Sequence, residues 1–123
     1  MLTRQAALLF ANSWIDAWNA HDLPRILAHY TDEFEMSSPL IVERMGVASG
    51  TLRGKEAVGA YWQIGLDATP PLKFEFVELF VGVESVVVYY RSFGRKLVAE
   101  LFYFNDDGKI YRAASHHGPT SLR

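Results

Sequence analysis

The sequence predicts an α+β fold in which three N-terminal helices pack on a curved antiparallel sheet. Two patterns predict this class: apolar residues recur at helical spacing over much of residues 4–67, and four segments rich in β-branched and aromatic residues follow. The chain has 123 residues, of which 50% are hydrophobic. This size suits one domain, residues 1–123, with a core of its own.

The first two helices are predicted from wheel positions and capping residues. Asp22 has the chemistry of an N-cap, and Pro24 is tolerated in the first turn of the short helix predicted over residues 23–30. The break at residues 19–21 separates this helix from the first one. The apolar face of the first helix carries Ala7, Phe10, Trp14 and Trp18.

A strand, a loop and a third helix are predicted next. Residues 32–38 alternate between apolar and polar side chains, as in a half-buried strand, and Pro39 ends the pattern. Residues 40–54 show no clear period and are interpreted as a long loop with room for a short strand. The third helix is predicted over residues 55–67, before the Thr69-Pro70-Pro71 stop.

Four strands complete the predicted sheet. They are joined by short, glycine-containing hairpin signals, which predict an antiparallel meander. Residues 86–90 and 97–104 are apolar on both faces, whereas a sheet with one face in water should alternate. We therefore expect a homodimer through the outer face of the sheet. The strands are predicted over residues 73–83, 85–93, 96–105 and 109–117.

The bulk composition excludes several classes of protein. The net charge of −2 argues against a nucleic-acid partner, which usually requires a basic face. No stretch approaches the roughly 18 apolar residues of a membrane span, so no membrane partner is expected. The chain has no cysteine, which excludes disulfides and thiolate chemistry and is compatible with a cytoplasmic protein.

Local sequence and element order together resemble one superfamily. Residues 14–23 (WIDAWNAHDL), 30–39 (YTDEFEMSSP), 51–58 (TLRGKEAV) and 105–110 (NDDGKI) resemble its first helix junction, first strand, third-helix entry and last hairpin. The chain thus resembles the nuclear transport factor 2-like superfamily and its SnoaL-like family over essentially its whole length. The resemblance implies a cone-shaped domain with an apolar pocket. It implies no single activity, because this superfamily hosts isomerases, cyclases, hydrolases, dehydratases and binding modules.

Ketosteroid isomerase is the member of this superfamily whose chemistry can be compared residue by residue. The resemblance puts Ser38 where that enzyme has its carboxylate base, Trp14 where it has a tyrosine donor, and Glu100 where it has a protonated acid. A serine hydroxyl cannot act as a base at neutral pH without an activator, and an indole is a weaker acid than a phenol. Only Glu100 keeps the chemistry, so that isomerisation is not expected here.

Glu100 is the first candidate catalytic residue. It interrupts an otherwise apolar strand and shares a face with Val98 and Phe102, so it is predicted to point into the cone. Desolvation there would raise its pKa toward neutrality, as suits a general acid or base. The alternative is that Glu100 faces outward or pairs with a buried Arg or Tyr.

His117 is the second candidate catalytic residue. If Tyr111, Ala113 and Ser115 point inward, His117 does too, and it could then form an acid–base pair with Glu100. The alternative is an exposed histidine near the end of a strand.

The remaining candidates form the walls of the pocket. Trp18 and Tyr30 are interpreted as core, and Arg91 as outward-facing. Residues 21, 29, 116 and 117 are histidines without metal-ligand spacing, so no metal and no cofactor are expected. The residues predicted to contact an apolar small-molecule ligand are Trp14, Ser38, Tyr61, Trp62 and Phe102.

Three functions remain open from the sequence. The first is a SnoaL-like small-molecule enzyme doing cofactor-independent acid–base chemistry of isomerase, cyclase or hydrolase type. The second is a non-catalytic protein of the same fold that binds an apolar ligand, and the third is a dimerisation module. An isolated charge in an apolar strand favours the enzyme, because burying it without a purpose or partner is costly. The serine at position 38 favours the other two.

Overall fold

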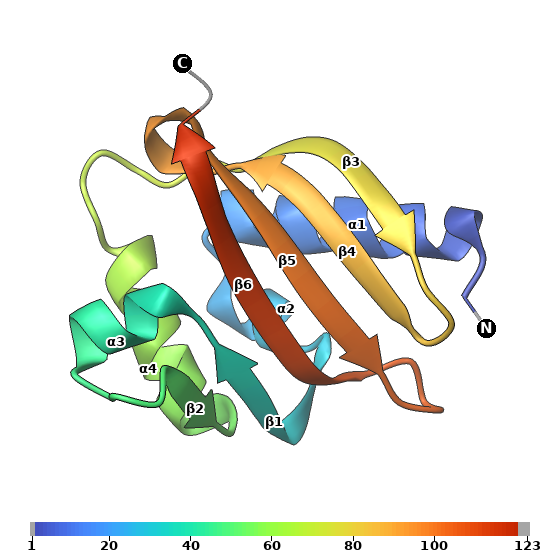
Figure 1. Cartoon of the computed structure of the whole chain (residues 1–123), viewed down its shortest axis with the longest axis horizontal. Helices are drawn as coiled ribbons and strands as arrows, with labels where there is room; N and C mark the ends of the chain where they lie inside the picture. Colours follow the sequence, from blue (N-terminus) through green and yellow to red (C-terminus); the bar gives the residue numbers. More distant parts are fainter. Residues whose placement is uncertain (1, 121–123) are drawn as a thin grey trace.

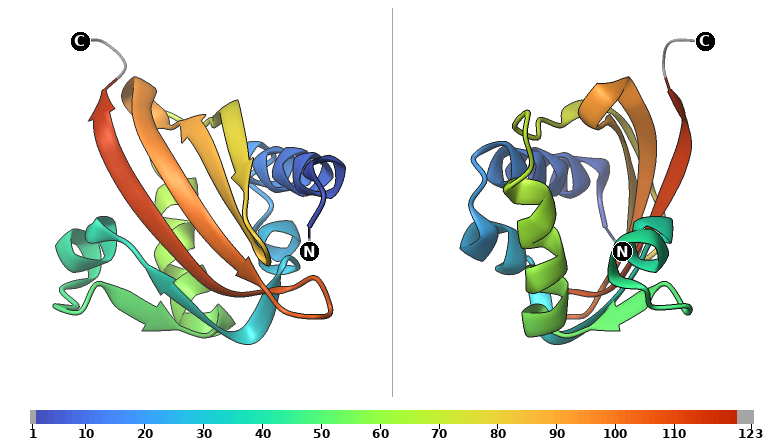
Figure 2. Two further views of the ribbon diagram at one scale, coloured as in Figure 1. Left: turned by 45° about the vertical axis from the view of Figure 1, so that its right-hand side comes forward. Right: turned by 90° about the vertical axis from the view of Figure 1, so that its left-hand side faces the viewer.

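The computed structural model describes residues 2–120, in which helices cover one face of a six-stranded sheet. Figure 1 shows the sheet in front of α1 and α2, and Figure 2 shows the opposite sheet face without a covering helix. The helices are α1 (Arg4–Asn19), α2 (Leu23–Leu27), α3 (Pro39–Met45) and α4 (Lys55–Leu66), with a 3-10 turn η1 (Phe93–Arg95). The strands are β1 (Tyr30–Ser37), β2 (Thr51–Arg53), β3 (Glu75–Val81), β4 (Ser85–Arg91), β5 (Lys96–Phe104) and β6 (Ile110–Thr120).

The sheet is mixed rather than wholly antiparallel. Its strand order is β2-β1-β6-β5-β4-β3, and the meander from β3 to β6 is antiparallel as predicted. β1, however, lies parallel to β6. A parallel neighbour requires a long crossover, and the chain between β1 and β6 supplies it. The sequence pattern of β1 alone carries no information on this partner.

The start of α2 follows the predicted capping chemistry, and α1 starts at a cap that was not predicted. The Thr3 hydroxyl accepts a hydrogen bond from the backbone N–H of Ala6, and the Asp22 carboxylate accepts one from the N–H of Arg25. Each cap satisfies a backbone donor that the first turn of a helix leaves unpaired. These two caps set the starts of α1 and α2. α1 then packs against β3, and α2 packs against α1 and α4.

The segment predicted as a loop contains a fourth helix, α3. Ser38 is its N-cap, Pro39 is its first residue, and Gly46 ends it in the left-handed conformation at φ 67°. Proline at the first helical position and glycine just after the last are ordinary helix punctuation. The alternating pattern of residues 32–38 predicts a strand that Pro39 ends, whereas Pro39 is the first residue of a helix. The short strand that the predicted loop allowed for is present as β2.

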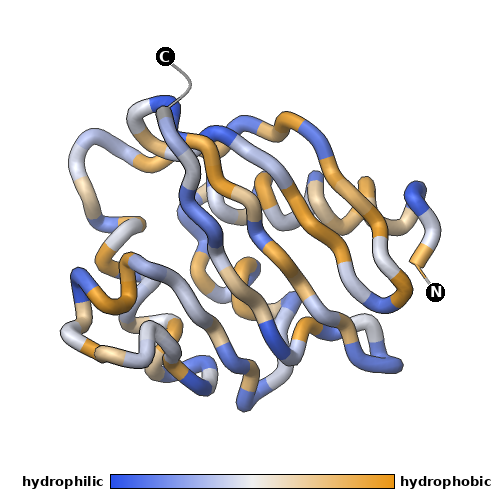
Figure 3. The backbone as a smooth tube through the Cα atoms, viewed as in Figure 1, coloured by the Kyte–Doolittle hydropathy of each residue, from blue (hydrophilic) through white to orange (hydrophobic). Residues whose placement is uncertain are grey.

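A single hydrophobic core fills the space between α1, α4 and the inner sheet face. The inner-facing residues of β5 alternate with outer-facing ones along the whole strand, as its burial pattern shows. In Figure 3 the hydrophobic colour covers much of β4 and β5. Within residues 2–120, none of the helices has both the length and the apolarity that crossing a membrane requires.

One register shift changes which residues of β6 face the core. Tyr103 pairs with Arg112, whereas Phe104 pairs with Ile110, so Tyr111 is the extra residue of a β-bulge. Tyr111 is consequently 47% exposed instead of pointing inward, and Ile110 is buried. Beyond the bulge the alternation resumes, and Ala113, Ser115 and His117 share the inner face, although the His117 side chain is also exposed to solvent.

Candidate functional site

A cavity of about 250 Å³ opens between the helices and the inner face of the sheet. Its volume is slightly below the roughly 300 Å³ at which typical ligand sites begin, so it suits a small ligand. Three of the segments that line it, α3, residues 68–72 and η1, lie on the left side of Figure 1. The polar and charged residues of its wall are Ser38, Arg44, Tyr61, Thr69, Tyr90, Ser92, Glu100, Ser115 and His117. The aromatic ones, besides the two tyrosines, are Trp14, Trp18, Trp62, Phe74 and Phe93.

Glu100 lies deep in this cavity, with only 2% of its surface exposed. It is paired with Ser115 across β5 and β6, and the Ser115 hydroxyl donates a hydrogen bond to Glu100 Oε1. The Tyr90 hydroxyl donates a second hydrogen bond to the same oxygen, at 3.3 Å. Both bonds end on Oε1, and Oε2 accepts none from the residues that the structure describes. Oε2 is therefore the oxygen left for a ligand.

The environment of Glu100 moves its pKa into the physiological range. Burial raises the pKa from its ordinary value to about 7, because desolvation disfavours the carboxylate more than the two hydrogen bonds from Ser115 and Tyr90 stabilise it. At neutral pH the acid and its conjugate base are then both well populated. A group in that state can release a proton and take one up within the same reaction.

A second polar group, nearer the surface, consists of Ser38, His117 and Tyr61. Ser38 Oγ lies 3.4 Å from His117 Nε2, and it also accepts a hydrogen bond of 3.1 Å from the backbone N–H of Leu40. Ser38 thus caps α3 while contributing to the cavity wall.

The histidine and the tyrosine of this group are both held in their neutral forms. Partial burial lowers the pKa of His117, and the positive charges of Lys96 and Arg44 lower it further, against a smaller opposing effect of Glu43. Burial raises the pKa of Tyr61, against the effects of its Ser38 hydrogen bond and the Arg44 charge. A neutral imidazole can both donate and accept a hydrogen bond, so His117 is suited to polar contact with a ligand.

Aromatic side chains form the apolar wall. Trp14 stacks on Phe74 with 5.8 Å between ring centroids, and its Nε1 donates a 2.9 Å hydrogen bond to the hydroxyl of Tyr30. Tyr30 itself is core, as predicted. Trp18, interpreted from the sequence as core, also lines the cavity, and its buried Nε1 has no acceptor among residues 2–120.

Most predicted site residues come together, with two differences. Trp14, Ser38, Tyr61, Trp62, Glu100 and His117 line one cavity. Phe102 does not line it: this side chain is fully buried with its ring against those of Phe10 and Trp14. Glu100 and His117 share the cavity without a direct hydrogen bond, because β5 pairs Glu100 with Ser115 and His117 with Val98.

Sequence reasoning missed Tyr90, Ser115 and Arg44 as site residues. The inward position of Tyr90 follows from the alternation of β4, and that of Ser115 follows once it is paired with Glu100. Those positions could have been found by alternation, but their contact with Glu100 depends on strand register. Arg44 lines the cavity from α3, which the sequence analysis did not predict as a helix.

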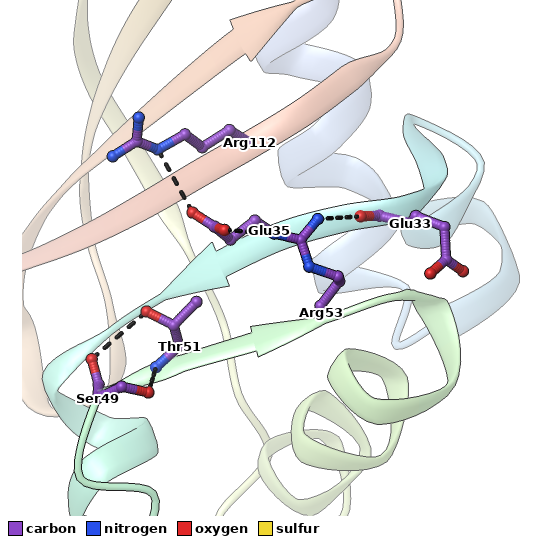
Figure 4. Close-up of polar contacts among 6 residues, drawn as sticks. All are labelled: Glu33, Glu35, Ser49, Thr51, Arg53 and Arg112. Carbon is purple, nitrogen blue, oxygen red and sulfur yellow. Dashed lines mark hydrogen bonds and ion pairs between the residues drawn. The ribbon is translucent and has the colours of Figure 1, made fainter.

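A separate charged cluster lies away from the cavity, where β1 meets β2 and β6 (Figure 4). Arg53 Nη2 lies 2.8 Å from Glu35 Oε1, and Arg112 Nε lies 3.7 Å from Glu35 Oε2. These side chains pair with one another at the surface and none lines the cavity. In the described part of the chain, no group of three or more His, Cys, Asp or Glu residues could hold a metal ion.

Comparisons with known proteins agree on the family. The family model of the SnoaL-like domain matches residues 11–116. The chain is 49% identical to a SnoaL-like protein of unknown function from Burkholderia thailandensis, whose crystal structure superposes with a TM-score of 0.91. That match covers 94% of this chain and 97% of the other. A comparison with functionally curated proteins gave no match.

More distant crystal structures share the fold. An NTF2-like protein of unknown function from Cytophaga hutchinsonii is 16% identical, with a TM-score of 0.69 over 97% of this chain and 93% of that one. A candidate isomerase of the SnoaL-like family from Agrobacterium tumefaciens is 14% identical, with a TM-score of 0.72. That match covers 90% of this chain and 96% of the other. The matched domain covers most of the chain, and the architecture is that of these neighbours. This protein therefore belongs to the SnoaL-like family and has the nuclear transport factor 2-like fold.

Proposed function

We propose that this SnoaL-like protein is a small-molecule enzyme whose Glu100 transfers a proton to and from an apolar substrate without a cofactor. The observation that carries the proposal is the buried Glu100 carboxyl, with Oε1 held by Ser115 and Tyr90 and with a pKa raised by burial to about 7. A buried acid with a neutral pKa in a ligand-sized cavity is an arrangement typical of proton-transfer sites. The reaction would be of isomerase, cyclase or hydrolase type.

The geometry supports a simple proton transfer at Oε2. In its ionised form Glu100 removes a proton from a substrate carbon next to a carbonyl group, so that a C–H bond breaks and an O–H bond forms at Oε2. The electron pair of the broken C–H bond forms a C=C bond, and the π pair of the carbonyl group moves to its oxygen. The proton on Oε2 then returns to the same carbon or, in an isomerisation, to another carbon of the conjugated system, and the carbonyl group forms again. Ser115 and Tyr90 hold Oε1 throughout, which fixes the direction in which Oε2 points.

The negative charge that develops on the substrate requires hydrogen-bond donors. Tyr61, Ser38 and His117 provide hydroxyl groups and a neutral imidazole in the same cavity. Donors already in place before the reaction stabilise a developing oxyanion without the cost of reorganisation. In this proposal His117 therefore stabilises charge and does not act as the proton-transfer partner of Glu100.

The alternative function is a non-catalytic binding module of the same fold. The observation that favours it is Ser38, which caps α3 and leaves that position without a carboxylate base. In this alternative the cavity holds an apolar small molecule and Glu100 serves as a polar contact for it. The two functions predict the same binding but differ in turnover.

We also infer that the protein acts as a homodimer through the outer face of the sheet. No element of residues 2–120 covers this face (Figure 2). Its partly exposed apolar residues come from adjacent strands, and Phe80 reaches 59% exposure. A second copy of the same face would cover it symmetrically. The residues concerned are Phe80, Val87, Tyr89, Leu97, Ala99, Leu101 and Tyr103.

A solvent-exchange assay separates catalysis from binding. The protein would be incubated in D₂O with a panel of small cyclic ketones, lactones and epoxides, and deuterium incorporation or product formation would be followed by ¹H NMR. We expect turnover of at least one compound by the parent, and loss of about 100-fold or more in Glu100→Gln. Glu56→Gln, an exposed residue of α4, is the matched control and should behave as the parent.

The outcomes of this assay discriminate between the two functions. Full turnover by Glu100→Gln would contradict the role assigned to Glu100. Binding of panel compounds without exchange or product would support the binding module instead. If no compound changes the tryptophan indole N–H signals, none of them binds, and this result would argue against both the enzyme and the binding module.

A further inference from the structure

The charged groups of the cavity wall are arranged asymmetrically. Among the described residues that line the cavity, Glu100 is the only carboxylic acid and Arg44 is the only lysine or arginine. Glu100 is buried, whereas Arg44 is exposed on the last turn of α3. The cavity thus has an acid at its base and a permanent cation at its opening.

Arg44 has no ion-pair partner within residues 2–120. The other arginines that bond to carboxylates, such as Arg53 and Arg91, do so away from the cavity. After burial and Lys96, the charge of Arg44 is the next cause that lowers the pKa of His117. It also opposes the rise that burial causes in the pKa of Tyr61. These effects indicate that the guanidinium lies near the polar group at the opening.

A free guanidinium on a cavity wall is suited to one class of ligand group. Its planar set of N–H donors matches a carboxylate, which it can bind through two parallel hydrogen bonds. The neighbouring Ser38, Tyr61 and His117 are uncharged, so no further positive charge lies beside Arg44 on this wall. This combination fits a singly charged head group better than a doubly charged one.

We propose that the cavity takes a small carboxylic acid, whose carboxylate binds Arg44 at the opening while its apolar body lies against the aromatic wall. This inference rests on the proposed function of the site and adds the class and orientation of the substrate. The apolar body would contact Trp14, Trp62 and Phe74. The carboxylate stays away from Glu100, because two carboxylates in one apolar cavity repel each other. The reacting carbon is therefore at the end of the molecule far from its carboxylate.

The cavity volume limits the size of that acid. A volume of about 250 Å³ lies just below the roughly 300 Å³ at which typical small-molecule sites begin. A ligand with one ring and a short side chain suits a cavity at this small end of the range. The inferred substrate class is thus a monocyclic or short-chain acid.

The proposal is tested with pairs of acids and their amides, which differ in charge but hardly in shape. The probes are 3-phenylpropanoate with 3-phenylpropanamide, and cyclohexylacetate with cyclohexylacetamide. Dissociation constants would be measured at about pH 6 by NMR titration of the tryptophan indole N–H signals, because Glu100 is then mainly protonated. The proteins compared are the parent, Arg44→Gln, Arg44→Lys and the control Arg53→Gln, which removes an arginine outside the cavity.

We expect the parent to bind at least one acid about tenfold more tightly than its amide, and Arg44→Gln to lose that preference while binding the amide as before. Arg44→Lys should keep part of the preference, since an ammonium retains the charge but not the paired donors. Arg53→Gln should match the parent. The proposal is overturned if no acid binds more tightly than its amide, including the case in which no probe binds, or if Arg44→Gln keeps the preference.

Failure of this inference is distinguishable from failure of the proposed function. If proton exchange depends on Glu100 but no acid binds more tightly than its amide, the proposed enzyme activity is supported and the carboxylic acid substrate is contradicted. If acids bind more tightly than amides in an Arg44-dependent way but no compound exchanges protons, the protein is a non-catalytic module that binds carboxylates.

Discussion

Glu100 and Ser115 face each other across β5 and β6, and the Ser115 hydroxyl donates its hydrogen bond to Glu100 Oε1. The pairing fixes the carboxyl group against the sheet. Tyr90, on the other neighbouring strand, donates to the same oxygen at 3.3 Å. Three adjacent strands therefore position one acid, and its second oxygen remains for the ligand.

Removing the Ser115 hydroxyl should raise the pKa of Glu100. Ser115→Ala deletes the stronger of the two hydrogen bonds that oppose the effect of burial. A hydrogen bond to a charged group contributes about 1.5–3 kcal/mol, so a rise of about one pKa unit is expected. The carboxyl absorption in difference infrared spectra would measure it. Tyr90→Phe should shift the pKa in the same direction by less, and a fall in either variant would contradict the assigned hydrogen bonds.

The contribution of Glu100 to the free energy of unfolding should fall as the pH rises from about 4.5 to 7. Glu100 keeps its proton up to about pH 7 in the folded protein but loses it near its ordinary value of 4.5 in the unfolded chain. The unfolded state therefore binds fewer protons over this window, and the contribution, on the order of 3 kcal/mol, is lost by the upper end.

The pH dependence can be isolated with one variant. Urea unfolding of the parent and of Glu100→Gln would be compared between about pH 4 and pH 8. Gln cannot ionise, so the free energy of unfolding of the parent should decline relative to the variant across the window. The exposed Glu56→Gln should follow the parent. Parallel curves for the parent and Glu100→Gln would show that Glu100 is not buried with a raised pKa.

The hydrogen bond between Trp14 and Tyr30 should be visible as a coupling energy. Trp14→Phe leaves the buried Tyr30 hydroxyl without its donor, and Tyr30→Phe leaves the indole N–H without its acceptor. An unpaired buried polar group costs about 1–3 kcal/mol, beyond any loss of packing. The double variant should therefore lose about 1–2 kcal/mol less than the sum of the single variants. Strict additivity in urea unfolding would mean that this bond contributes nothing.

The outer sheet face should carry the dimer contact. Leu101→Glu puts a charge at the centre of that face and should convert a dimer into monomers in analytical ultracentrifugation. Leu9→Glu is the control, because Leu9 is 68% exposed on α1, away from the sheet face. A parent that sediments as a monomer at all concentrations would contradict the proposed dimer.

The sequence predicted most elements because their signals are local. The hairpin turns, the caps at Asp22 and the break after α1 depend on residues close in the chain. The inward direction of Glu100 also followed from alternation alone, since β5 is regular over its length. The same reasoning failed at Tyr111, where a bulge inserts one residue and reverses the alternation.

Helix α3 was the element that the sequence analysis missed, although its signals were present. Ser38, Pro39 and Gly46 are a cap, a first residue and a stop in standard positions. The segment has only seven residues, too few for a clear apolar period. Missing it also removed Arg44 from the candidate site.

By itself the sequence determined the α+β class, the order of the elements other than α3 and the isolated acid in β5, because periodicity and turn chemistry act over a few residues. Tertiary structure alone decided that β1 lies parallel to β6, that Ser115 and Tyr90 meet Glu100, and that Phe102 packs in the core while Trp18 reaches the cavity. These facts depend on strand register and on how helices cross the sheet. Both arise from contacts between residues distant in the chain, which no local pattern encodes.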